Sequence, residues 1–155
     1  MGMESRKILI VEDDAIIAAA ESIILRNHGY DIITVLGGAE AIAAVRSRDG
    51  EIGLILMDIE LGPGKDGTEI AREILRERRI PILFISSHSA KEIAAKTEGI
   101  PSCGYVLKEA GDAALLASIE AAFRTPGPDG HTPPPGGDGA GSLPGVGVTR
   151  RDARG

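Results

Sequence analysis

The sequence has 155 residues, of which 43% are hydrophobic and 26% are charged, and its formal net charge is −6. These values fit one globular domain, and the negative charge argues against direct nucleic-acid binding, which normally needs a basic surface. A single cysteine excludes a disulfide framework. No apolar run approaches the ~18 residues of a membrane span, and no signal-peptide pattern opens the chain. We therefore expect a cytoplasmic protein with no membrane contact.

Glycine and proline divide the chain into two parts. Of the 30 glycines and prolines, 15 fall in residues 125–155, a stretch that contains one leucine, two valines and no aromatic residue. Such a segment buries too little apolar surface to offset the entropy of ordering it. We expect a folded domain over residues 1–124 and a disordered tail over residues 125–155.

Short apolar runs alternate with segments of helical periodicity along the folded part. In chain order the expected elements are strand 7–11, helix 15–27, strand 30–36, helix 39–48, strand 52–57, helix 68–78, strand 82–85, helix 89–99, strand 103–107 and helix 112–123.

The ends of these helices have recognisable signals. Asp14 suits the N-cap of the first helix, and Gly29 suits its C-terminal end. The sequence from Ser89 to Glu92 matches a capping box. One stripe of the first helix is formed by Ile16, Ala20, Ile23, Ile24 and Asn27, and a stripe rich in apolar residues normally faces the core.

Five strand-helix pairs in succession predict a parallel sheet with helices on both faces. The expected fold class is therefore α/β, a three-layer doubly wound sandwich with five strands and five helices. In such sheets, ligands bind beyond the carboxyl ends of the strands, so functional side chains should be sought there.

Three kinds of reactive group follow the expected strands. Glu12 and Asp13 follow the first strand and Asp58 the third, while Ser86 follows the fourth and Lys108 the fifth. Crowded carboxylates resist ionising together, and a Mg²⁺ ion with oxygen ligands would remove that penalty. A hydroxyl and an ammonium group can hold phosphoryl oxygens. Together these groups support phosphoryl transfer to an aspartate.

The segments ILIVEDD, LILMDIEL, ILFISS and GYVLK resemble a response-regulator receiver domain of two-component signalling. The resemblance covers about residues 6–123 and implies a flavodoxin-like fold. It also implies that Asp58 accepts the phosphoryl group and helps to hold Mg²⁺. In the same scheme Asp13 is a direct metal ligand, Glu12 belongs to the acidic pocket, and Glu60 offers a backbone carbonyl to the metal.

The resemblance also assigns a switch. Ser86 takes the place of the switch hydroxyl, Lys108 pairs with the phosphate, and Tyr105 is the aromatic switch residue. The implied partners are a sensor histidine kinase or phosphotransfer protein and a downstream protein target. A homodimer through the fourth helix, fifth strand and fifth helix is a further possibility. The implied protein is a signalling switch rather than an enzyme, with only self-catalysed phosphoryl transfer and dephosphorylation.

The sequence departs from the usual receiver pattern in two places, and two alternative functions remain open. Glu109 follows Lys108 where the family usually has proline, and the loop LGPGKDG is longer than usual, which puts the local loop geometry in question. Asp58 and Glu60 form a D-x-E pattern, so a Mg²⁺-dependent phosphohydrolase with an aspartate nucleophile is one alternative. A receiver-like binding module that is never phosphorylated is the other.

Overall fold

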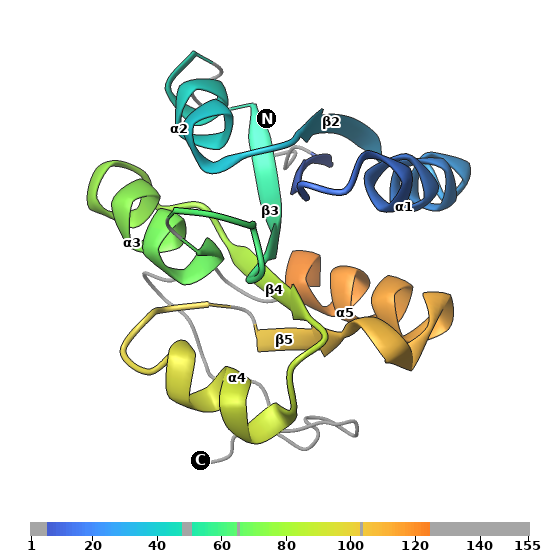
Figure 1. Ribbon diagram of the computed structural model, residues 1–155. Helices are drawn as coiled ribbons and strands as arrows, with labels where there is room; N and C mark the ends of the chain where they lie inside the picture. Colours follow the sequence, from blue (N-terminus) through green and yellow to red (C-terminus); the bar gives the residue numbers. More distant parts are fainter. Residues whose placement is uncertain (1–5, 48–50, 65, 103, 125–155) are drawn as a thin grey trace.

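The computed structural model describes residues 6–47, 51–64, 66–102 and 104–124. The strands and helices alternate along the chain (Figure 1). Their bounds are β1 (Lys7–Val11), α1 (Ala15–Asn27), β2 (Asp31–Val35), α2 (Gly38–Ser47), β3 (Ile52–Asp58), α3 (Gly67–Glu77), β4 (Ile82–Ser86), α4 (Ala90–Lys96), β5 (Gly104–Leu107), the 3-10 turn η1 (Lys108–Ala110) and α5 (Asp112–Arg124).

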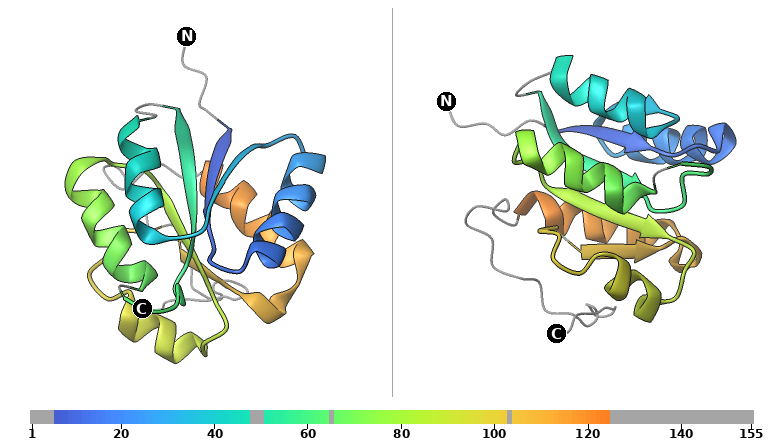
Figure 2. Two further views of the ribbon diagram at one scale, coloured as in Figure 1. Left: turned by 45° about the horizontal axis from the view of Figure 1, so that its top comes forward. Right: turned by 60° about the vertical axis from the view of Figure 1, so that its left-hand side comes forward.

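All five strands form one parallel sheet in the order β2-β1-β3-β4-β5. Two apolar clusters lie on opposite faces of this sheet. One joins it to α2, α3 and α4, and the other joins it to α1 and α5. Figure 2 shows α2 and α3 on one side of the sheet and α1 and α5 on the other. The predicted three-layer doubly wound α/β fold is confirmed. The apolar strands are continuous because both sides of each central strand are buried.

Most predicted boundaries lie within one or two residues of the observed ones. The exception is the expected helix 89–99, which stops earlier, at Lys96. Asp14 caps α1 as predicted, because its Oδ1 accepts hydrogen bonds from the backbone N–H groups of Ile16 (3.0 Å) and Ile17 (3.2 Å). The capping box from Ser89 to Glu92 is also present. Cys103 and the predicted tail over residues 125–155 lie outside the described residues.

The stripe of α1 singled out in the sequence does not face the core. Ile16 is 82% exposed and Ile23 is 60% exposed. The residues of α1 that are buried are Ala18, Glu21, Ser22 and Leu25. The sequence of α1, AIIAAAESIILRN, is apolar around most of its circumference, so hydrophobic periodicity does not identify the side that faces the sheet.

None of the helices within the described ranges is long and apolar enough to cross a membrane.

Candidate functional site

The predicted site residues lie at the carboxyl edge of the sheet. Asp58 ends β3 and Ser86 ends β4, while Glu12 follows β1 and Lys108 follows β5. Backbone hydrogen bonds between neighbouring strands continue one residue past the strand ends. The N–H of Glu12 donates to the carbonyl of Val35 at 3.2 Å, and the N–H of Ile59 donates to the carbonyl of Ile85 at 3.0 Å. The parallel register therefore brings Glu12 next to Asp58, because Val11 pairs with Met57.

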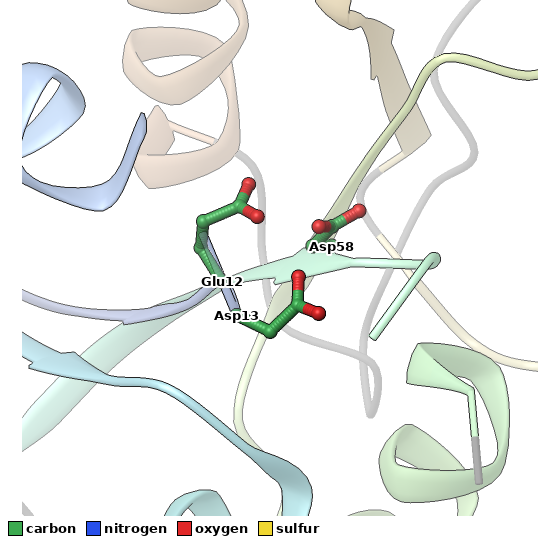
Figure 3. Close-up of side chains that lie close together, drawn as sticks. All are labelled: Glu12, Asp13 and Asp58. Atoms are coloured by element: carbon green, nitrogen blue, oxygen red, sulfur yellow. The ribbon is translucent and has the colours of Figure 1, made fainter. Parts of the chain in front are cut away.

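Three carboxyl groups meet at this edge. Glu12, Asp13 and Asp58 each offer one oxygen, and these oxygens all lie within 4.8 Å of one another. Figure 3 shows the three carboxyl groups gathered at the end of β3. Glu12 and Asp58 are 1% and 0% exposed, whereas Asp13 is exposed. The site is therefore a buried pair of acids with a third at its solvent side.

Lys108 contacts both buried acids. Its Nζ lies 3.2 Å from Oδ2 of Asp58 and 3.4 Å from Oε1 of Glu12. Burial, followed by the neighbouring Glu12, raises the pKa of Asp58 to about 8, although Lys108 acts in the opposite direction. Burial lowers the pKa of Lys108, but the charges of Asp58 and Glu12 outweigh it and raise that pKa above its usual value. One ammonium group thus only partly compensates two buried carboxyl groups.

The donor set fits a divalent cation. Oε1 of Glu12 is buried and receives no hydrogen bond from the residues that the structure describes, although the Lys108 ammonium lies 3.4 Å from it. A buried carboxylate oxygen with so little compensation is costly. Close carboxylate oxygens, one of them open to water, are the ligands that Mg²⁺ prefers. Glu12, Asp13 and Asp58 could therefore hold Mg²⁺.

Two glycines let the backbone approach these acids. A Cβ at Gly67 would collide with the carbonyl oxygen of Asp58, and the N–H of Gly67 donates to the carbonyl of Ile59 at 2.8 Å. Gly62 has a φ of +81°, and a Cβ there would lie 2.9 Å from Oδ2 of Asp13. The segment between β3 and α3 can follow this path because both positions lack a side chain.

Ser86 belongs to a second group of side chains, centred on Glu60. The buried hydroxyl of Ser86 donates a hydrogen bond to Oε2 of Glu60. The backbone N–H and the hydroxyl of Ser87 both donate to Oε1 of Glu60, each at 3.2 Å. Nε2 of His88 lies 3.2 Å from Oε2. Partial burial raises the pKa of Glu60, but the bonds from Ser86 and Ser87 and the nearby His88 together lower it below its usual value.

This second group was not predicted. The family resemblance implied that Glu60 offers its backbone carbonyl to the metal, and that role stays a prediction. The Glu60 side chain turns to the end of β4 and is absent from the group of Glu12, Asp13 and Asp58. Its position two residues after Asp58 placed it at the same edge as Ser86, but the direction of the side chain was not readable from the sequence.

Tyr105 lies on β5, opposite Phe84 of β4. It is partly buried and packs against the apolar cluster that also contains Ile93 of α4. Lys108, which directly follows β5, is the first residue of η1. The peptide bond after Lys108 is trans, as are all the peptide bonds of the described ranges. Glu109 in place of proline is thus accommodated in a short turn that still directs Lys108 to Asp58.

Glu21 is a further acid that sequence analysis missed. It lies on the buried side of α1 and is 8% exposed. Burial and the charge of Glu12 raise its pKa to about 7, although Lys108 acts against them. Oε1 of Glu21 has no hydrogen-bond partner within the described part of the chain. The acidic character of the site therefore extends from the strand ends into the layer between α1 and the sheet.

Comparisons with known proteins agree with this arrangement. The model of the response regulator receiver domain family matches residues 8–120. The chain is 30% identical over 118 residues to the transcriptional regulatory protein PdtaR of Mycobacterium tuberculosis, covering 76% of this chain and 56% of that protein. The chain thus spans little more than half the length of this curated relative.

Two solved structures are similar in fold and in sequence. One is the N-terminal domain of a response regulator/sensory box/GGDEF three-domain protein from Carboxydothermus hydrogenoformans, with 36% identity and a TM-score of 0.70, covering 76% of this chain and 94% of that one. The other is the signal receiver domain of a modulated diguanylate cyclase from Desulfovibrio desulfuricans G20, with 33% identity and a TM-score of 0.66, covering 76% and 93%. The chain belongs to the response regulator receiver domain family.

Proposed function

We propose that this receiver domain accepts a phosphoryl group on Asp58 from a sensor histidine kinase or a phosphotransfer protein, in a Mg²⁺-dependent reaction. The observation that supports it is the joint contact of Lys108 with Asp58 and Glu12, beside an exposed third acid, Asp13. Single acids at strand ends commonly cap helices, but a buried aspartate between an ammonium group and two further acids suits phosphoryl transfer.

A cation at Glu12, Asp13 and Asp58 would offset the repulsion of the carboxylates and hold phosphoryl oxygens. In its absence, burial and the neighbouring Glu12 raise the pKa of Asp58, and a protonated carboxyl group is a poor nucleophile. Added positive charge at the site would therefore favour the reactive carboxylate form of Asp58.

In the transfer step, a carboxylate oxygen of Asp58 attacks phosphorus. A P–O bond to Asp58 forms while the bond to the donor breaks, and that donor is a phosphohistidine nitrogen in a kinase or an acetate oxygen in acetyl phosphate. Lys108 is placed to contact the negatively charged phosphoryl oxygens, because its Nζ already lies 3.2 Å from Oδ2 of Asp58. The donor leaves as the free imidazole or as acetate.

The output is proposed to be a change in protein contacts. Ser86 would leave its present partner to bind the phosphoryl group, and Tyr105 would repack at the face formed by α4, β5 and α5. A downstream protein, or a second copy of the chain, would bind that face in a cytoplasmic setting. A local change of charge would thus bias an element with two arrangements.

Labelling with a small phosphodonor tests this proposal. Incubation with labelled acetyl phosphate should label the wild-type protein in Mg²⁺ and not in EDTA, and Asp58→Asn should abolish the label. Asp14→Asn is the matched control. Its carboxylate lies at the same edge but caps α1, and asparagine caps helices equally well, so this variant should label normally.

Three other results would reject the proposal. Full labelling of Asp58→Asn would place the phosphoryl group elsewhere. Absence of labelling and of Mg²⁺ binding in a folded wild-type protein would favour a binding module. Sustained turnover of a phosphate monoester, many cycles per molecule, would favour a phosphohydrolase.

A further inference from the structure

We propose that the carboxylate of Glu60 is a positioning group that holds the Ser86 hydroxyl in a resting orientation and thereby opposes phosphoryl binding at Asp58. The inference rests on the proposed function, because it concerns how the phosphoryl site is regulated. It goes further by assigning a role to a side chain outside the group of acids at Asp58.

The hydroxyl of Ser86 has a single proton to donate. Ser86 donates this proton to Oε2 of Glu60, while its oxygen accepts the backbone N–H of His88 at 2.9 Å. A hydroxyl has one donor, so Ser86 cannot donate to Glu60 and to a phosphoryl oxygen at the same time. Engagement of the phosphoryl group therefore requires the bond to Glu60 to break.

That bond is of the stronger kind. Its acceptor is a carboxylate, and hydrogen bonds to ionised groups are shorter and stronger than neutral ones. Ser86 is fully buried, so water does not readily replace Glu60 as its partner. The resting arrangement is consequently favoured over one in which the hydroxyl of Ser86 points elsewhere.

Glu60 is itself fixed in place. Ser87 provides two donors to Oε1, and His88 contacts Oε2. The backbone N–H of Glu60 donates to Oδ1 of Asp58 at 3.0 Å. A single residue thus contacts the acceptor aspartate through its main chain and the switch hydroxyl through its side chain.

The same group of contacts reaches the start of α4. Nδ1 of His88 lies 3.7 Å from Oε1 of Glu92. Glu92 in turn closes the capping box with Ser89, the N-cap of α4. If Glu60 released Ser86, the contact of His88 with Glu60 would change, while His88 would still contact Glu92 at the cap of α4. These polar side-chain contacts therefore connect the phosphoryl site with α4.

Binding of beryllofluoride with Mg²⁺, a phosphoryl mimic that forms on aspartate, provides an equilibrium test. Binding is followed by calorimetry and fluorine NMR on the full chain. Glu60→Ala should raise the affinity for beryllofluoride roughly tenfold, because binding no longer requires the hydrogen bond between Ser86 and Glu60 to break. Glu60→Gln should give a smaller rise, since its amide oxygen still accepts from Ser86. Glu109→Ala removes an exposed charge next to Lys108 and serves as the control.

A double-mutant cycle separates this role from simple charge repulsion. If Glu60 acts through Ser86, Glu60→Ala should have little effect in a Ser86→Ala background. An equal rise in affinity with and without Ser86 would show repulsion of the anion alone and would overturn the proposal. An unchanged or lower affinity in Glu60→Ala would overturn it as well. Failure of the folded wild-type protein to bind beryllofluoride would reject the proposed function, and the role of Glu60 with it.

Discussion

Replacing Asp58 with asparagine should stabilise the metal-free protein, and the gain should grow with pH. The side chain of Asp58 is fully buried beside Glu12, and the ammonium group of Lys108 contacts both carboxyl groups. Asparagine retains an oxygen that can accept the N–H of Glu60, which now bonds Oδ1 at 3.0 Å. The substitution therefore removes a buried ionisable group while preserving its shape and its main-chain contact.

The sign follows from the two pKa values of Asp58. Its ordinary pKa of 3.8 applies to the unfolded chain, and the pKa in the folded protein is about 8. Between these values the folded state binds more protons than the unfolded state, so stability falls as pH rises. The loss is absent below about pH 4 and complete above about pH 8. At about 1.4 kcal/mol for each pKa unit, its upper limit is about 5 to 6 kcal/mol. Because Glu12 and Lys108 both act on Asp58, the full shift does not belong to Asp58 alone, and we expect a net gain of about 2 to 4 kcal/mol for Asp58→Asn at about pH 8.

Urea unfolding followed by circular dichroism, in EDTA at about pH 5 and about pH 8, measures this gain. Asp31→Asn is the matched control, since Asp31 is exposed on β2 and its loss should change the free energy of unfolding very little. Mg²⁺ should reduce the difference in the free energy of unfolding between Asp58→Asn and the wild type, because the wild type retains all three acids that would bind the cation. A gain that is equal at both pH values would refute the reasoning.

Three further predictions concern residues around the site. Glu21→Gln should stabilise the protein by about 1 to 2 kcal/mol, because burial raises the pKa of Glu21 to about 7. The gain should appear as pH rises from about 4.5 to about 7, and urea unfolding across that range measures it. A gain that does not change with pH would contradict this prediction. Gly67→Ala should destabilise the fold by about 2 to 4 kcal/mol, since its Cβ would collide with the backbone of Asp58; an unchanged thermal midpoint would show that the segment moves aside freely. Ser89→Ala should cost about 1 kcal/mol through loss of the bond from the Glu92 N–H; stability measured by urea should fall and helicity decrease, and equal values for variant and wild type would count against the cap.

The sheet was predictable because each strand is defined by local pattern. Segments such as KILIV and ILFIS are continuous apolar runs of strand length, as burial on both faces requires. The residues that follow them are then placed at one edge by parallel topology alone. This is why Glu12, Asp58 and Lys108 could be expected together before any distance was known.

Side-chain direction was less predictable. In α1, the isoleucines share one side of the helix, while alanines keep most of the remaining circumference apolar. Ile16 and Ile23 could therefore be assigned to the core, although the helix buries Glu21 and Ser22. The partner of Ser86 was hidden for a similar reason. Whether Glu60 turns to the acids or to the end of β4 depends on rotamers and neighbours from two loops, and sequence spacing carries no information on these.

The attachment of α4 has a consequence for local opening. This helix has seven residues, and Ile93 is the one of them that is fully buried. Burial of one isoleucine contributes only about 1.5 to 3 kcal/mol. The amide hydrogens of α4 should therefore exchange with solvent through small, subglobal openings, whereas those of the central strand β3 should wait for global unfolding. The protein thus has a segment of low local stability directly beside Ser86, and repositioning that segment would leave the rest of the fold intact.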